Sequence, residues 1–182
     1  MVSNKRTKAV MIDFETLGTR ADAAVISLGA VKFDPYSDFI EADGFYRSIS
    51  IDSNLQAGRS IDESTLIWWM GQSKKARKVF TEQKVTLDTA LNDFIDWVGD
   101  GSKLEIWSNG ASFDIPMLDH SLRTHGADPV FQFWNHRCFR TIKALPQMKN
   151  APKAANMFKH NALMDAHAQA LQLQIYFKEM AA

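Results

Sequence analysis

Two acidic residues follow a short apolar run near the start of the chain, within residues 10–18. The run predicts a buried strand that continues into Asp13 and Glu15. Because side chains at i and i+2 point to the same face of a strand, both carboxylates aim at one point, while Phe14 faces the other side. Neighbouring like charges cost free energy unless a cation neutralises them, and carboxylates suit Mg²⁺ or Mn²⁺. The alternative is a strand end whose acids point into water.

The composition is that of an ordinary globular protein with no strong electrostatic bias. We expect one domain over residues 1–182, with residues 1–7 as a flexible N-terminal segment. The 21 basic and 21 acidic residues balance, which argues against a protein that coats nucleic acid non-specifically. The only cysteine, Cys138, allows no intramolecular disulfide and favours a cytoplasmic location. No apolar run is long enough for a signal peptide or a membrane span.

The hydrophobic pattern predicts strands first, followed by helices alternating with strands. Strands at 8–14, 23–33 and 44–51 should form an antiparallel meander, and 104–108 should be a short buried strand. Helices are expected at 63–72, 87–98, 112–125, 138–145 and 162–180, with a loop at 148–159. This order predicts an α/β fold in which a central mixed sheet, the meander plus parallel strands, is flanked by helices.

A further acid follows the predicted strand at 104–108. Asp114 falls in the first turn of the next helix, which Ser112 can cap. The strand end can deliver Asp114 beside Asp13 and Glu15. An acid in a first helical turn is also a common partner of the helix dipole, so both interpretations stay open here.

The final helix carries a fourth acid in an alanine- and leucine-rich stretch. Asp is a poor helix former, so Asp165 indicates an inward-facing polar site. His160, just before this helix, can reach the same opening, although a solvated loop histidine is the alternative. His167 is interpreted as an exposed helix residue.

Three motifs occur in a fixed order along nearly the whole chain: Asp13-x-Glu15-Thr16, Asn109-x-x-x-Phe113-Asp114 and His160-x-x-x-x-Asp165. They resemble the motifs of the DEDD exonucleases, which have a ribonuclease H-like fold. The histidine five residues before the last aspartate resembles the DEDDh, or DnaQ-like, form. The pair Trp68-Trp69 is similar to a smaller branch with phage 3′–5′ exonucleases and a mycobacterial exoribonuclease.

The resemblance implies a 3′–5′ exonuclease that hydrolyses phosphodiester bonds at the 3′ end of single-stranded DNA or RNA and releases nucleoside 5′-monophosphates. It implies two divalent cations, Mg²⁺ or Mn²⁺, with Asp13 bridging both. Glu15 and Asp165 would hold the ion that carries the attacking water, and Asp114 the ion at the leaving 3′ oxygen. His160 would be the general base, since its ordinary pKa lies near neutrality.

The residues that the resemblance places against the substrate are Thr16, Leu17, Asn109, Phe113 and Trp68. Thr16 would bond the terminal 3′-hydroxyl, Leu17 would wedge against the last base, and Phe113 or Trp68 would stack on bases. A half-exposed packing role is the alternative for Trp68. One cluster of cations is either a solvated face or a set of phosphate contacts: Lys74, Lys75, Arg77 and Lys78. A second concentration of cations, in the segment that leads to His160, indicates one basic rim on a neutral protein: Arg137, Arg140, Lys143, Lys149, Lys153 and Lys159.

Two other functions remain as alternatives. A non-catalytic nucleic-acid-binding module on the same fold predicts the loss of an acid or of the histidine, and none is missing. A ribonuclease H-like endonuclease does not need the His-x-x-x-x-Asp ending. DNA and RNA are not separated, because no residue can be assigned to the 2′-hydroxyl. The resemblance also allows a homodimer and a phage or bacterial source, with the host cytoplasm as the location if viral.

Overall fold

The computed structural model describes residues 7–154 and 160–181, and it has a five-stranded mixed sheet at its centre. The strands are β1 (Ala9–Thr16), β2 (Val25–Phe33), β3 (Phe45–Ser48), β4 (Glu105–Ser108) and β5 (His136–Cys138), in the spatial order β3-β2-β1-β4-β5. β1 pairs antiparallel with β2, and β2 with β3, whereas β1–β4 and β4–β5 are parallel. The predicted fold class is confirmed. The flexible segment expected at 1–7 lies, apart from Thr7, outside the described residues.

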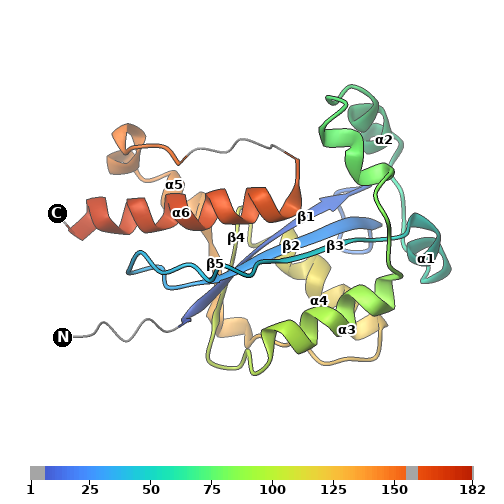
Figure 1. Cartoon of the computed structure of the whole chain (residues 1–182), viewed down its shortest axis with the longest axis horizontal. Coiled ribbons are helices and arrows are strands. Elements are labelled where there is room, and N and C mark those ends of the chain that lie inside the picture. The colour runs from blue at the N-terminus through green and yellow to red at the C-terminus, as the bar shows by residue number, and fades with distance from the viewer. Residues whose placement is uncertain (1–6, 155–159, 182) are drawn as a thin grey trace.

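Helices cover both faces of this sheet (Figure 1). The α-helices are α1 (Ile51–Gln56), α2 (Glu63–Met70), α3 (Leu87–Val98), α4 (Asp114–Thr124), α5 (Phe139–Lys143) and α6 (Ala162–Ala181). Short 3₁₀ turns are η1 (Ala76–Phe80), η2 (Phe133–Asn135) and η3 (Pro146–Asn150). α5 and α6 lie on one face, and α3 and α4 on the other. None of the helices in the described part of the chain has the length and apolar character that crossing a membrane requires.

The alternation of side chains along β1 determines which residues point to each face of the sheet. Ile12 and Phe14 belong to the core beneath α3 and α4, and Met11 belongs to the core beneath α6. Since residues two apart share a face, Asp13 and Glu15 follow Met11 onto the α6 side. The carboxyl end of β1 therefore presents its acids to the start of α6.

Four local expectations differ from the structure. The loop expected at 148–159 begins within the 3₁₀ turn η3, and its residues 155–159 lie outside the described residues. The predicted third strand stops at Ser48, because the Ser50 hydroxyl accepts a bond from the Ser53 amide and begins α1. The helix expected at 138–145 is preceded by the short edge strand β5. Ser112 does not cap α4, since the N-cap position is Phe113 and no side chain bonds there.

Two hydrogen bonds attach α2 to the end of β1. The Trp69 indole donates to the Thr16 carbonyl at 2.9 Å, and the Asp62 amide donates to the Leu17 carbonyl at 2.8 Å. Trp69 is buried in a small core cluster under α2. These bonds fix both ends of α2 next to the carboxyl end of β1.

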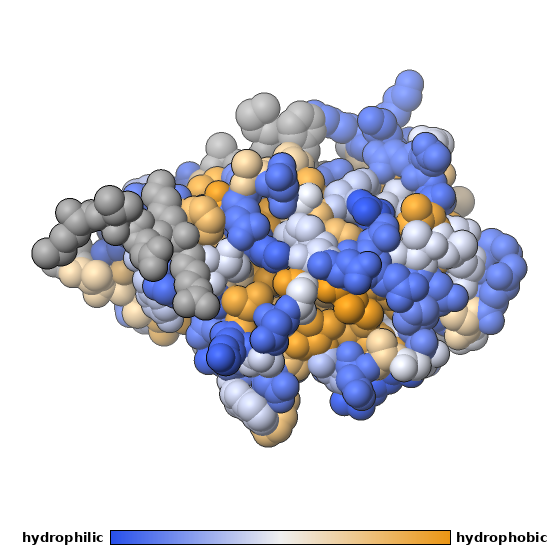
Figure 2. Space-filling view, turned by 60° about the horizontal axis from the view of Figure 1, so that its bottom comes forward, coloured by the Kyte–Doolittle hydropathy of each residue, from blue (hydrophilic) through white to orange (hydrophobic). Residues whose placement is uncertain are grey.

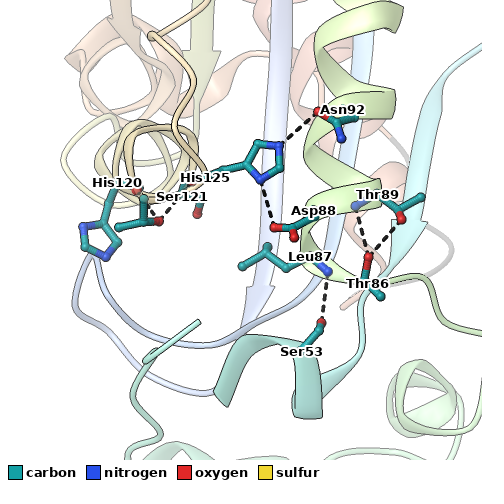
Figure 3. Close-up of polar contacts among 10 residues, drawn as sticks. Ser53, Thr86, Leu87, Asp88, Thr89, Asn92, His120, Ser121 and His125 are labelled. Carbon is teal, nitrogen blue, oxygen red and sulfur yellow. Dashed lines mark hydrogen bonds and ion pairs between the residues drawn. The ribbon is translucent and has the colours of Figure 1, made fainter. Parts of the chain in front are cut away.

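On the opposite face, α3 is tied both to α1 and to the end of α4 (Figure 3). The Thr86 hydroxyl caps α3 by accepting from the Thr89 amide at 3.1 Å. His125, after α4, contacts Asp88 at 2.9 Å and Asn92 at 3.0 Å through its two ring nitrogens. Figure 2 shows the molecule with the bottom of Figure 1 turned forward. Hydrophilic residues cover most of this surface and surround a recessed apolar area.

The first turn of α6 lies directly on the backbone of β2. Gly29, which pairs with Asp13 in the β1–β2 ladder, faces this turn. A Cβ at Gly29 would come within 2.1 Å of the backbone carbon of Ala162 and the nitrogen of Leu163. Only a residue without a side chain permits this approach. The glycine opposite Asp13 therefore sets how close α6 comes to the acids.

We expect Gly29→Ala to push the start of α6 away from the sheet. The free energy of unfolding should fall by about 1–3 kcal/mol, as for overpacked cores, and Mn²⁺ affinity should fall as well. Thermal unfolding and Mn²⁺ titration measure the two effects. Gly71→Ala is the control, because a Cβ there meets its nearest atom at an ordinary 3.4 Å. Equal stability and metal affinity in both variants would contradict the role of Gly29.

Candidate active site

Three carboxylates converge at the carboxyl end of β1. Asp13 and Glu15 from β1 and Asp165 from α6 each offer an oxygen, and these oxygens lie within 4.8 Å of one another. A register shift in the β1–β2 ladder falls between Glu15 and Thr16, where β1 ends. Such bulges commonly re-aim a side chain next to an active site. The structure thus brings together residues 150 positions apart in the sequence.

Asp165 is held by a reciprocal cap at the start of α6. The Asn161 side chain accepts from the Met164 amide at 3.1 Å, and the Asp165 carboxylate accepts from the Asn161 amide at 3.1 Å. This arrangement resembles a capping box, in which two unpaired donors of a helix start are satisfied. Asp165 consequently lies in the first turn of α6, where an acid complements the helix dipole, rather than in mid-helix.

The fourth acid, Asp114, approaches β1 from the other side of the strand end. It opens α4, and its Oδ1 accepts a bond from the Phe14 amide at 3.2 Å. Asp114 is only 4% exposed. It is close enough to Asp13 and Glu15 to raise the pKa of both, although it is not part of the group of three.

Burial and mutual repulsion make these acids reluctant to ionise together. Burial, with the Asp114 and Glu15 charges, raises the pKa of Asp13 well above its ordinary value. Burial and the charges of Asp165 and Asp114 raise the pKa of Glu15 to about 8. Burial also raises the pKa of Asp114 to about 6, against the bond from the Phe14 amide. A site of this kind favours a bound cation over bare carboxylates.

The donor set fits a divalent metal ion. Clustered carboxylate oxygens are hard ligands, which suit Mg²⁺ or Mn²⁺ rather than metals that prefer sulfur. Asp13, Glu15 and Asp165 are the residues that could hold it, with Asp114 beside them. Their individual roles as ligands stay predictions.

Gln169 contacts the site and was missed in the sequence. It lies one turn after Asp165 on α6, and its amide donates to Asp13 Oδ1 at 2.8 Å. This bond counteracts the rise in the pKa of Asp13. The available signal was the i, i+4 spacing, which puts Gln169 and Asp165 on one helical face. Because no motif includes this position, the spacing alone was not informative.

His160 directly precedes the capped start of α6 and is not part of the group of three acids. Its backbone is left-handed, with φ of 62°, which is uncommon for a residue other than glycine but several-fold enriched for His. The ring packs edge-on against Trp68, with centroids 5.1 Å apart, and lies 6.2 Å from that of Trp69. His160 is thus packed against the tryptophans of α2 and is not a member of the group of three acids.

A cavity of about 320 Å³ opens beside Glu15. Thr16, Trp68 and Phe113 line it, so three of the five predicted substrate contacts share one pocket. Trp68 is 45% exposed, and the Thr16 hydroxyl donates to the Gly18 carbonyl at 2.7 Å. This hydroxyl can still accept a bond from a ligand.

The two other predicted contacts differ. Leu17 is fully buried in the core cluster beneath α2, so the expected wedge against a terminal base does not fit this residue. Leu17 instead contributes its backbone carbonyl, which accepts the bond from the Asp62 amide at the start of α2. Asn109 is half-buried, and its carbonyl accepts from the Arg140 amide at 3.1 Å. It does not line the cavity beside Glu15.

The mixed sheet has a ribonuclease H-like fold, and its central strand ends in a cluster of acids that could hold a divalent metal ion. The family model described as "3'-5' exoribonuclease Rv2179c-like domain" matches residues 8–177. The chain belongs to this family, within the DEDDh exonucleases. It is a 3′–5′ exonuclease that depends on divalent metal.

Two known proteins are similar to this chain, one in sequence and the other in fold. An exodeoxyribonuclease of enterobacteria phage T4 is 33% identical over 161 residues, which cover 74% of this chain and 70% of that protein. The crystal structure of E. coli Exonuclease I in complex with a dT13 oligonucleotide has the same fold, with a TM-score of 0.65 at 12% identity. The match covers 93% of this chain and about 40% of Exonuclease I.

The raised pKa of Glu15 predicts how the metal-free protein responds to pH. Between pH 4.5 and about 8 the folded carboxyl keeps a proton that the unfolded chain has released. The free energy of unfolding should therefore fall as pH rises through this window, by up to about 1.4 kcal/mol per pH unit for one group. In Glu15→Gln this contribution disappears, which thermal unfolding in EDTA at several pH values measures. Glu179→Gln, an exposed change on α6, is the control, and an identical pH slope in both variants would refute the assignment.

Gln169→Leu should weaken metal binding without abolishing the fold. Loss of the amide frees Asp13 to turn away, and the loss of such outer partners typically costs about 10–100-fold in metal affinity. Mn²⁺ titration followed by electron paramagnetic resonance gives this affinity directly. The matched control is Gln174→Leu, because Gln174 on the same helix bonds the Asp34 and Phe39 carbonyls. Unchanged Mn²⁺ affinity in Gln169→Leu would contradict the role of the residue.

Proposed function

We propose that this enzyme removes nucleotides one at a time from the 3′ end of single-stranded DNA or RNA and releases nucleoside 5′-monophosphates. The observation that carries the proposal is the convergence of Asp13, Glu15 and Asp165 beside a nucleoside-sized cavity lined by Phe113 and Trp68. The family supports an RNA substrate, and the phage T4 relative supports DNA. The oligonucleotide bound to Exonuclease I supports a single strand.

The carboxylates would hold two divalent cations, Mg²⁺ or Mn²⁺. When bound, such a pair supplies charge stabilisation for an in-line displacement at phosphorus. Asp13 is the central ligand in this proposal, with Glu15 and Asp165 on one side and Asp114 on the other. Gln169 fixes the orientation of the Asp13 carboxylate through its 2.8 Å bond.

The terminal nucleoside is proposed to occupy the cavity beside Glu15. Phe113 and Trp68 give it aromatic surface, and base stacking on such rings tolerates every base. The Thr16 hydroxyl can accept a hydrogen bond from the terminal 3′-hydroxyl. These contacts would put the last phosphodiester bond next to the carboxylates.

His160 is proposed as the general base that takes a proton from the attacking water. Histidine suits this role because its ordinary pKa is close to neutrality. Its position outside the group of three acids leaves its ring available for proton transfer rather than for metal binding.

The decisive experiment is the digestion of 5′-labelled single-stranded DNA and RNA of equal sequence, with Mg²⁺ or Mn²⁺ and with EDTA. We expect a metal-dependent ladder that shortens from the 3′ end, and the faster strand identifies the substrate. His160→Ala should lower the rate by about 10²–10⁴-fold while Mn²⁺ affinity is retained. Asp13→Asn should lose both cleavage and Mn²⁺ affinity.

The alternatives give different results in the same assay. Internal cuts would favour an endonuclease, and binding without cleavage of either strand would favour a non-catalytic module. Loss of Mn²⁺ affinity in His160→Ala would contradict its role as a base and make it a ligand.

A further inference from the structure

A strongly basic segment lies beside the candidate active site and has no role in the chemistry described above. Four cations fall within five residues at the start of η1, namely Lys74, Lys75, Arg77 and Lys78. No acid occurs between Glu63 and Glu82. Because the chain as a whole is neutral, this concentration of charge is a local feature with its own field.

The cations are presented outward by the packing of η1. Ala76 and Val79 are 4% exposed and anchor the turn in the cluster beneath α2, so the side chains between them point to solvent. Arg77 contacts the Met70 carbonyl at 3.3 Å, which ties this cation to the end of α2. The spacing of the buried residues Ala76 and Val79 therefore leaves the basic side chains on the exposed face of η1.

Two hollows connect these cations with His160. A hollow of about 570 Å³ is lined by Lys74, Arg77 and their two basic neighbours. An adjoining cavity of about 360 Å³ shares Lys75 and Lys78 with it and reaches His160. Because the two hollows share these lysines, we treat them as one groove, which extends from η1 to His160.

The walls of this groove differ in chemistry. Beside the cations, the adjoining cavity is lined by apolar side chains of η1 and α6, including Val79, Leu163 and Met164. Its lining also includes Glu82, whose carboxylate accepts a bond from the Tyr46 hydroxyl at 2.7 Å. Met164 is 39% exposed. A single nucleic-acid strand has this pairing of properties, since its phosphates are anionic and its unpaired bases are apolar on their faces. A duplex hides its bases and would not use the apolar wall.

We propose that this groove binds the part of a single strand that precedes its last nucleotides. The inference rests on the proposed exonuclease function and extends it. Phosphates would contact the cations of η1, while bases would lie against Met164 and its apolar neighbours. Substrates long enough to reach the groove are then held more tightly than a dinucleotide, which can occupy only the cavity beside Glu15 and the carboxylates.

The test compares two substrates in one triple variant, Lys74→Ala/Arg77→Ala/Lys78→Ala. The ratio of kcat/KM for a 12-nucleotide strand to kcat/KM for a dinucleotide should fall at least about tenfold. Each lost phosphate contact on a single strand contributes roughly 0.7 to the slope of log affinity against log salt concentration. The slope for a fluorescent 12-mer, measured in EDTA, should therefore become shallower by about 2.

A matched triple variant, Lys103→Ala/Arg123→Ala/Lys178→Ala, removes the same charge from exposed positions on other elements and should leave both quantities unchanged. Equal effects of the two triple variants would overturn the proposal, because total charge alone would then explain binding. An equal loss on both substrates would also overturn it, since the cations would then serve the fold. A larger loss of 12-mer binding in Lys143→Ala/Lys153→Ala would overturn the proposal too. It would indicate that the strand binds in the cavity between α5 and α6, which these lysines line.

The proposed function and the proposed groove are contradicted by different results. If the unaltered enzyme cleaves neither substrate, the proposed function fails, and the salt slope in EDTA still tests the groove. If it shortens both substrates but the slope does not change in the η1 variant, only the groove is wrong.

Discussion

The mutual repulsion of four nearby carboxylates is the constraint around which the rest of the structure is arranged. Asp13, Glu15, Asp114 and Asp165 come from a strand and two helices, so folding itself brings their charges together. Amides of Phe14, Asn161 and Gln169 donate to them, yet the pKa values of Asp13, Glu15 and Asp114 remain raised. The folded chain thus holds carboxyl groups that retain their protons unless a divalent cation replaces them, which couples metal binding to stability.

This constraint needs a backbone that lets α6 come close to the sheet. In the β1–β2 ladder, Gly29 stands opposite Asp13, and the first turn of α6 rests on its backbone. The same turn carries Asp165 and is capped by Asn161. A single glycine and a single cap therefore determine the separation between the acids of β1 and the acid of α6. The affinity for metal therefore depends on how closely α6 packs on β2.

Local patterns predicted the parts of the molecule that depend on local physics. Strand alternation placed Asp13 and Glu15 on one face, and helical periodicity located α3 with both ends correct. The rest depends on contacts between distant residues. β5 has only three residues and is a strand because it pairs with β4, and Leu17 is buried because α2 folds over it. Gln169 and Gly29 matter through partners 156 and 133 positions away, which no single-sequence pattern reveals.

His160 connects the chemistry to both substrate surfaces. On one side its ring packs against Trp68, which lines the cavity beside Glu15. On the other side it closes the end of the groove that leads to η1. Its left-handed backbone precedes the Asn161 cap, so the ring position also depends on the start of α6. A strand that filled the cavity and the groove together would contact residues on both sides of this histidine. A long substrate would therefore alter the surroundings of the residue proposed to move the proton, which gives a physical reason for a length preference to appear in kcat as well as in KM.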